Sequence, residues 1–228
     1  MSTLRTWIRR TCTSATIAAL CGGLLAPSVF AYQQDYRFTY SKLYTQLKNN
    51  LEEGHDSAQL GVFFVSVENG LPCPLSKAWM EKEEKYETLE ASPSHELLLP
   101  LDSHLRQANP LVFVEIDQPI QCDFSMVVMS KESMTGEVGY EQLTILQADM
   151  QQLLGELGGM FSRWFTPNVE GVTLEFALSS GEINISNGQS VPIVNHRASI
   201  DLRNFSPTDS LNIPESTLRV MPYIPSAN

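Results

Sequence analysis

The sequence predicts an α+β fold, in which a mixed or antiparallel sheet packs against one long amphipathic helix and the C-terminal part is rich in strands. The helix is predicted over residues 140–165, where apolar side chains recur in steps of three and four residues and so form one continuous stripe. Beyond residue 167, short segments alternate between apolar and polar residues, as strands do. The stripe consists of Leu143, Leu146, Met150, Leu153, Leu157, Met160 and Trp164, and it is widened by Leu154 and Phe161.

Residues 1–31 have the features of a cleaved export signal. A basic start precedes an apolar stretch over residues 11–26, and Ala31 supplies the small residue that a cleavage site requires. Two glycines and Pro27 interrupt the apolar stretch, which falls short of the roughly 20 residues of a membrane-spanning helix. We therefore expect a Sec-type signal peptide, cleavage before Tyr32, and a periplasmic or secreted protein with no integral membrane span after cleavage. The basic residues are Arg5, Arg9 and Arg10.

Two other interpretations of this segment agree less well with its residues. Lipidation at Cys21 requires a small residue immediately before the cysteine, where this chain has Leu20. A twin-arginine signal would use Arg9 and Arg10, but the apolar pair that usually follows soon afterwards is missing. Export followed by release is the better interpretation of both features.

The exported chain is acidic. The full sequence has a net charge of −11 at pH 7, and removal of three arginines with the signal peptide lowers this to −14. Such a charge argues against binding of nucleic acid or anionic lipid through a basic patch, whereas it is compatible with a cationic partner. The 197 residues after Ala31 suffice for one large domain or two small ones. We expect an α+β portion over 32–166 and a β-rich portion over 167–228, both within one domain.

The cysteines predict one disulfide bond. Cys12 and Cys21 belong to the signal peptide, so the exported chain keeps Cys73 and Cys122. An even pair in an oxidising compartment favours a disulfide over two free thiols. The bond would span a sequence separation of 49 residues. By the chain-entropy model, a loop of that size stabilises a fold by about 4 kcal/mol before any strain is subtracted.

The segment after the signal peptide predicts a helix and then a strand. The helix is expected over residues 41–53, with Ser41 as its N-terminal cap and Gly54 at its end. The run LGVFFVSV at 60–67 is apolar without alternation, so it predicts a strand that is buried on both faces.

The charged segment KAWMEKEEKYETLE, residues 77–90, fits two structures. Glu81 and Lys85 have the spacing of an ion pair on a helix, and Trp79 and Tyr86 can share one helical face. The same charges would protect an exposed edge strand from pairing with other chains. The acidic residues lack the spacing of a calcium-binding loop, so we expect a solvated surface and not a metal site.

Several later segments carry local signals of secondary structure. Asp102 is placed to cap one short helix, and the Asn-Gly pair at 187–188 predicts a tight hairpin turn. The apolar runs 111–116 and 122–129 flank the short loop DQPIQ, which predicts that they are neighbouring antiparallel strands. Further strands are predicted over residues 96–101, 172–178, 198–205 and 217–224.

The predicted helix over 140–165 contains three glycines, each of which costs about 1 kcal/mol relative to alanine inside a helix. They leave two interpretations open, a continuous helix or two shorter helices broken near Gly155. A coiled-coil dimer also fits the apolar repeat, but charges flank the stripe too sparsely, so packing against a sheet is favoured. The glycines are Gly155, Gly158 and Gly159.

The sequence contains no motif of a familiar catalytic or metal centre. Its four histidines stand apart, and none belongs to an HExxH or HxH motif. A nucleophile elbow and a phosphate-binding glycine loop are also missing from it, so we expect no metal and no cofactor. Asp149 and Glu156 are seven residues apart and share one helical face, where a catalytic pair would need further groups from distant segments.

Aromatic residues are the feature of this sequence that most suggests a binding surface. A groove for a ligand or a peptide would use rings that are close in the fold and exposed to solvent. The alternative is that these rings fill the core. The candidate residues are Trp79, Tyr86, Phe161, Trp164 and Phe165.

Four segments of the exported chain have a distinctive sequence. They are YSKLYTQLKNN at 40–50, KAWMEKEEKYE at 77–87, NPLVFVE at 109–115 and LGGMFSRWFTPNVEGVTLEF at 157–176. In these segments the chain resembles an exported gammaproteobacterial family that is catalogued as a domain of unknown function. The resemblance extends over nearly the whole exported chain. It implies a periplasmic or secreted protein of a Gram-negative bacterium, and it supplies no activity and no catalytic residues.

These observations predict a non-enzymatic accessory or binding module of the cell envelope, with an envelope protein or a small ligand as its partner. The alternative is an envelope hydrolase whose site is assembled from non-contiguous residues. A cleft that contains a histidine near Asp149 or Glu156 would favour the hydrolase. A shallow aromatic surface without converging titratable groups would favour the binding module.

Overall fold

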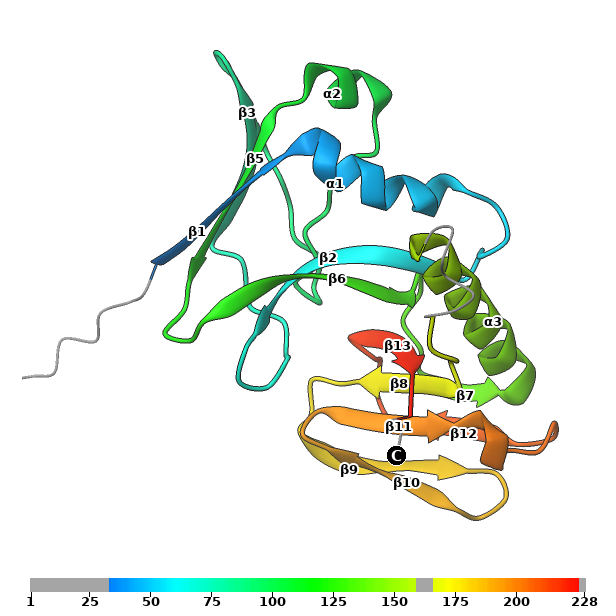
Figure 1. Cartoon of the computed structure of the whole chain (residues 1–228). Coiled ribbons are helices and arrows are strands. Elements are labelled where there is room, and N and C mark those ends of the chain that lie inside the picture. The colour runs from blue at the N-terminus through cyan, green and yellow to red at the C-terminus, as the bar shows by residue number, and fades with distance from the viewer. Residues whose placement is uncertain (1–32, 159–165, 226–228) are drawn as a thin grey trace, which may run out of the picture. The chain divides into compact units, whose positions relative to one another are not determined.

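The computed structural model describes residues 33–158 and 166–225, which belong to one compact unit (Figure 1). The helices are α1 (Tyr40–Leu47), the 3-10 helix η1 (Lys48–Leu51), α2 (Ser103–Ala108), α3 (Tyr140–Leu157) and the 3-10 helix η3 (Leu202–Asn204). The strands are β1 (Gln33–Thr39), β2 (Ala58–Ser66), β3 (Lys77–Lys82), β4 (Lys85–Thr88), β5 (Leu111–Asp117), β6 (Cys122–Ser130), β7 (Gly136–Gly139), β8 (Gly171–Glu175), β9 (Ser180–Ile185), β10 (Ser190–Val194), β11 (Arg197–Asp201), β12 (Ser210–Ile213) and β13 (Arg219–Tyr223).

The strands form three sheets (Figure 1). A four-stranded sheet has the order β1-β5-β3-β4, a two-stranded sheet pairs β2 with β6, and a curled seven-stranded sheet has the order β13-β8-β11-β10-β9-β12-β7. Every pair is antiparallel, so of the two expected sheet types the antiparallel one is formed. Helices and sheets are combined as expected, strands predominate, and the C-terminal part is β-rich.

Helix α3 is shorter than predicted. It ends at Leu157, so the expectation of one long helix is not supported. The apolar stripe is buried at Leu143, Leu146, Met150 and Leu153, where α3 packs against β2, β6 and β8. Leu157 is only partly buried, in contrast to its central place in the predicted stripe. Gly155 lies within the helix and does not break it, and residues 159–165 lie outside the described part of the chain.

The helix predicted over residues 41–53 is divided into α1 and η1. Strand β1, which the sequence did not predict, pairs with β5 up to Thr39, and α1 begins at the next residue. Ser41 therefore lies inside the first turn and cannot be the cap. Gly54 has a φ of +99°, a left-handed conformation that favours glycine, but it lies beyond the end of η1.

The charged segment 77–90 forms the hairpin β3–β4 and not a helix. The apolar alternation decides the outcome, because Ala78 and Met80 enter the core while Lys77, Trp79 and Glu81, which alternate with them, face outward. Glu83 occupies the tight turn with a φ of +55°. Strand β4 is at the edge of its sheet and fully exposed, as the edge-strand interpretation required.

The runs 111–116 and 122–129 do form strands, but they are not neighbours. Strand β5 lies between β1 and β3, whereas β6 pairs with β2 in another sheet. The loop between the runs therefore carries the chain from one sheet to the next. The strand predicted over 96–101 is wrong, since only an isolated bridge joins Ala91 to Leu97 there.

Other local predictions are confirmed. Strand β2 is buried along nearly all its length. Asp102 caps α2 by accepting hydrogen bonds from two backbone amides, which also lower the pKa of its carboxyl group. Gly188, with a φ of +88°, turns the chain between β9 and β10. Strand β13, which contains Pro222, is at the edge of the curled sheet.

The disulfide between Cys73 and Cys122 is confirmed. Both residues are buried, and the bond ties the first residue of β6 to the loop that follows β2. The same loop is anchored by the backbone amide of Cys73, which donates to the carbonyl oxygen of Phe64 in β2 at 2.7 Å. The bond thus reinforces the two-stranded sheet at one end.

Removal of this disulfide is expected to lower the free energy of unfolding by about 2–5 kcal/mol. The double variant Cys73→Ala/Cys122→Ala leaves no unpaired thiol, and urea unfolding against the oxidised wild type measures the difference. In the wild type without residues 1–31, which contain Cys12 and Cys21, thiol titration of the unfolded, unreduced protein should find no reactive group. Two reactive thiols would refute the bond.

A buried ion cluster joins the curled sheet to the rest of the core. Glu175 on β8 is in register with Arg197 on β11 and with Arg219 on β13, and its carboxylate accepts from both guanidinium groups. Arg197 also donates to the carbonyl oxygen of Gly70 at 2.7 Å, and Arg219 lies over the ring of Phe63 on β2. The cluster therefore fixes the C-terminal strands against β2 and its following loop.

Candidate functional site

Three aromatic side chains stand in a row on one face of the four-stranded sheet, and we call this row the aromatic ladder. Trp79 on β3 and Phe113 on β5 are direct cross-strand neighbours, with ring centroids 5.0 Å apart and planes inclined by 9°. Tyr86 on β4 continues the row, with its centroid 6.1 Å from that of Trp79. Alternating residues of neighbouring strands project from the same face, so pairing between β4, β3 and β5 builds the ladder.

The ladder lies on the open face of this sheet. The opposite face sends Ala78, Met80, Val112 and Val114 into the core, and α1 and α2 lie on that side (Figure 1). No described element packs on the ladder, and Tyr86 keeps 52% of its surface exposed. Aromatic residues that contribute little to the core but remain grouped at the surface are characteristic of binding sites.

Charged groups surround the ladder. The Lys77 ammonium lies over the Trp79 ring, 4.4 Å from its centroid, and 5.7 Å from the centroid of Tyr86. The indole nitrogen of Trp79 donates to the Glu81 carboxylate at 3.2 Å. Arg37 on β1 is in register with Phe113 and extends the row beyond the rings. The surface is therefore aromatic in the middle and polar at its rim.

The structure brings together two of the five predicted aromatic residues, Trp79 and Tyr86. Phe161, Trp164 and Phe165 lie outside the described residues. Phe113 was not predicted as a site residue, because the run 111–116 has the composition of a core strand. Its alternation with the buried Val112 and Val114 was the signal that could have placed it on the outer face.

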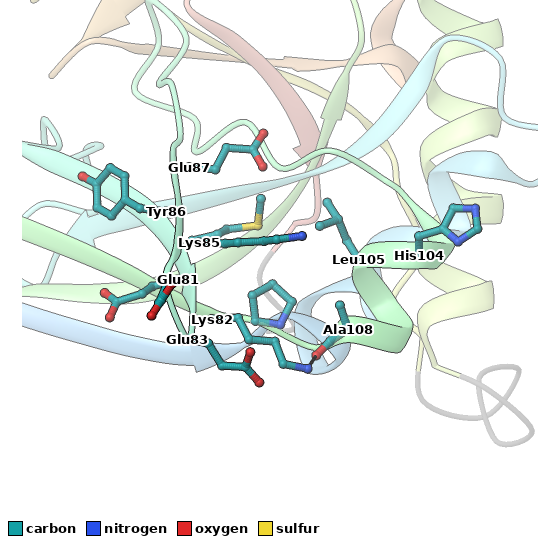
Figure 2. Close-up of a pocket in the computed structure, with 12 residues that line it drawn as sticks. Glu81, Lys82, Glu83, Lys85, Tyr86, Glu87, His104, Leu105 and Ala108 are labelled. Carbon is teal, nitrogen blue, oxygen red and sulfur yellow. Dashed lines mark hydrogen bonds between the residues drawn. The ribbon is translucent and has the colours of Figure 1, made fainter.

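A hollow of about 830 Å³ lies on the other side of the β3–β4 hairpin, between the hairpin and α2. Figure 2 shows Lys85 pointing toward Leu105 of α2, whereas Glu81 and Tyr86 point away from that helix. Lys82 bridges the hollow by donating to the carbonyl oxygen of Ala108 (Figure 2). Its lining mixes acidic and basic side chains without a buried polar group aimed into it, so it indicates no particular ligand.

The loop that follows η1 packs along one face of α3. Ser57 donates to the Asp149 carboxylate through its hydroxyl at 2.5 Å and its backbone amide at 2.7 Å. His55, in the same loop, lies beside Glu156, which follows Asp149 by two turns of α3; its Nε2 is 3.3 Å from the Glu156 carboxylate. The predicted common face of Asp149 and Glu156 is thus the face to which this loop is attached.

This arrangement does not form a hydrolytic triad. The Ser57 hydroxyl donates its hydrogen bond directly to Asp149, whereas a Ser-His-Asp triad places an imidazole between these two groups. His55 is 0% exposed and cannot reach a substrate. The adjoining cavity, about 570 Å³, is lined by Ser57 and Asp149 but not by His55.

A second carboxylate has a more unusual environment. Glu96 lies in a pocket of about 410 Å³ that is lined by residues from several distant segments. Burial raises the pKa of Glu96 to about 7, and within the described residues no hydrogen bond or ion pair satisfies its carboxyl group. Gly61 on β2 provides the space, since a Cβ there would lie 3.0 Å from a Glu96 oxygen. The lining also includes Ser92, Ser94, Lys131, Glu132 and Thr217.

The raised pKa predicts that Glu96 lowers stability as the pH rises. The pKa of Glu96 is about 7 in the folded protein and 4.5 in its ordinary state. Between pH 4.5 and 7 the folded protein therefore keeps a proton that the unfolded chain has lost, and the free energy of unfolding falls as the pH rises through this range. The full shift corresponds to about 3 kcal/mol, which partial solvent exposure reduces to about 1–2 kcal/mol. Urea unfolding should show Glu96→Gln to be more stable than wild type at pH 8 by this amount. Equal pH dependence of the two proteins between pH 5 and 8 would contradict the assignment.

The described ranges, 33–158 and 166–225, contain no group of three or more potential metal-ligating side chains. Within the same ranges, no helix has both the length and the apolar character needed to cross a membrane. The candidate sites in this part of the chain are therefore the aromatic ladder and the Glu96 pocket.

The chain belongs to a protein family whose model, described as "Protein of unknown function (DUF2987)", matches residues 32–176. The matched segment contains the whole four-stranded sheet, the disulfide and Glu96. It ends one residue after Glu175, so Arg197 and Arg219 lie beyond it. No curated protein and no solved structure matches the chain.

Proposed function

We propose that this protein is a non-enzymatic binding module of the bacterial cell envelope, exported to the periplasm or the medium, and that the aromatic ladder is its ligand surface. The observation that carries the proposal is the stack of Trp79 on Phe113, both half-buried on the open face of the sheet, continued by the exposed Tyr86. Rings presented by a rigid sheet lose little conformational entropy when a ligand binds, and aromatic residues are frequent hot spots of binding surfaces.

Several further features support this setting. The basic and apolar start of the chain is typical of an export signal. The disulfide suits an oxidising compartment outside the cytosol. The ladder has charged groups at its rim, and among the residues that the structure describes no titratable groups converge there on a reactive centre, which fits a binding surface better than a catalytic site.

Co-sedimentation with purified envelope fractions tests this function. Peptidoglycan sacculi and outer-membrane fragments from a Gram-negative bacterium are incubated separately with the exported form, and bound protein is measured in the pellet. We expect one fraction to retain the wild type, and Trp79→Ala/Tyr86→Ala to reduce its affinity about tenfold or more. Lys85→Ala, on the opposite face of the hairpin, is the matched control and should bind as wild type does. The proposal fails if neither fraction retains the protein, or if the double variant binds normally.

The alternative, an envelope hydrolase, is supported by the Glu96 pocket. Its lining comes from Gln59, residues 92–94, Glu96, and the segments 129–133 and 216–218, which are distant in sequence. A carboxyl group with a pKa of about 7 is suited to general acid–base catalysis at neutral pH, and Glu132 in the same pocket would supply the second carboxylate of a pair.

Dye-labelled sacculi separate the two candidates. The binding-module proposal expects no release of soluble dye by the wild type. The hydrolase would be supported instead if the wild type released dye and Glu96→Gln abolished the release. The rate of release should then change with pH with a midpoint near 7. Glu132→Gln then shows whether a second carboxylate takes part.

A further inference from the structure

The Trp79 and Tyr86 rings already hold an ammonium group, which belongs to Lys77. The Lys77 nitrogen is 4.4 Å from the Trp79 centroid and 5.7 Å from the Tyr86 centroid, and these two centroids are 6.1 Å apart. Within the described residues, Lys77 makes no ion pair and no hydrogen bond. Its charged group therefore contacts the faces of the two rings and is otherwise exposed.

A carboxylate lies next to the same ring pair. Glu81 accepts the indole N–H of Trp79 at 3.2 Å and is in register with Tyr86 on the neighbouring strand. Aromatic faces carry negative electrostatic potential, and a nearby carboxylate adds to it, so both features favour a positive group. The net charge of −11 for the chain acts in the same direction over longer distances.

We propose that the faces of Trp79 and Tyr86 over which the Lys77 ammonium lies form a binding site for an ammonium group, primary or quaternary, of an external ligand, and that Lys77 occupies it until the ligand displaces it. This inference rests on the proposed function and specifies the class of ligand that the ladder takes. Lys77 acts as an intramolecular competitor, which keeps the exposed rings covered when no ligand is bound.

Displacement of Lys77 is physically easy. The side chain is exposed and flexible, and it leaves no buried charge behind when it moves into water. A cation–π contact at an exposed site is weak, so competition by Lys77 reduces the apparent affinity for a ligand by about two- to fivefold. Replacement of Lys77 should therefore raise the apparent affinity for the ligand by the same factor.

The experiment is an NMR titration of the exported protein with simple cations. Tetramethylammonium and n-butylammonium represent quaternary and primary ammonium groups, and neopentyl alcohol is an uncharged probe of similar size. The indole N–H signal of Trp79, assigned through Trp79→Phe, reports binding from the protein side. The methyl signal of tetramethylammonium should move upfield when it lies over the ring faces.

We expect saturable shifts with at least one cation and none with the alcohol. Lys77→Ala should bind the same cation about two- to fivefold more tightly, Glu81→Gln more weakly, and Tyr86→Ala should lose the shift. Lys85→Ala, on the opposite face, should behave as wild type does. A response to one cation only identifies the ammonium as primary or quaternary. Circular dichroism establishes that each variant is folded.

Three results would overturn the inference. They are the absence of saturable shifts with either cation in both the wild type and Lys77→Ala, equal shifts with the uncharged alcohol, and loss of binding in Lys77→Ala. None of them affects the co-sedimentation assay. Retention by an envelope fraction that depends on Trp79 and Tyr86 would still support the binding module, with a ligand of different chemistry.

Discussion

Replacement of Glu175 with glutamine is expected to lower the free energy of unfolding by about 3–5 kcal/mol. The Glu175 carboxylate accepts from Arg219 at 2.8 and 2.9 Å and from Arg197 at 3.0 Å. The Arg219 side chain is only 1% exposed, so loss of the carboxylate charge leaves its guanidinium buried and uncompensated. The amide keeps the size of the side chain, which confines the effect to charge and hydrogen bonding. Urea unfolding with the disulfide intact measures the difference.

Glu170→Gln is the matched control for this prediction. Glu170 precedes β8 and lies 3.5 Å from Arg203, but the side chains of this pair are 25% and 56% exposed. Exposed ion pairs contribute about 0–1 kcal/mol, so the control should change stability by no more than that. A similar small effect of both variants would show that the buried cluster does not stabilise the fold.

Local sequence signals correctly predicted the apolar side of β8 but not the burial of Glu175. Val172, Leu174 and Phe176 alternate with polar residues, and all three are buried as this pattern requires. The pattern places Glu175 on the solvent side, yet strands β11 and β13 bring an arginine to either side of it. These arginines follow 22 and 44 residues later, so their arrival depends on the register of the sheet, which no local pattern contains.

Strand partners were the hardest part of the fold to predict. The short loop between β5 and β6 suggested direct pairing, but strands that are consecutive in sequence are not always neighbours. Here β1, which no sequence signal predicted, occupies the edge beside β5. In the segment 77–90, a helical charge pair competed with strand alternation, and pairing of β3 with β5 decided in favour of the strand.

The candidate site shows the same division between local and distant information. The sequence identified Trp79 and Tyr86 as aromatic residues near a charged segment, and the turn between their strands places them side by side. Phe113 joins them only because β5 pairs with β3 in a register that aligns it with Trp79. The disulfide, by contrast, followed from counting cysteines, because only Cys73 and Cys122 lie beyond the predicted signal peptide.

The central helix gives the second large prediction, for Leu153→Ala. Leu153 is 0% exposed on the side of α3 that packs against β2, β6 and β8. Truncation removes buried apolar surface and leaves a cavity, which together cost about 2–5 kcal/mol of stability. Leu157, expected from the stripe to be equally buried, is only partly buried, so Leu157→Ala should cost less.

Ile145 provides the control on the same helix, because 53% of its surface is exposed. Ile145→Ala removes little buried area and improves helix propensity, so its effect should stay within about 0.5 kcal/mol. Urea unfolding of the three variants should therefore rank Leu153→Ala well below Leu157→Ala and Ile145→Ala. The midpoint should not change with protein concentration, because Leu153 packs within its own chain; an increase with concentration would indicate a helix-mediated dimer. A near-neutral Leu153→Ala would remove α3 from the core.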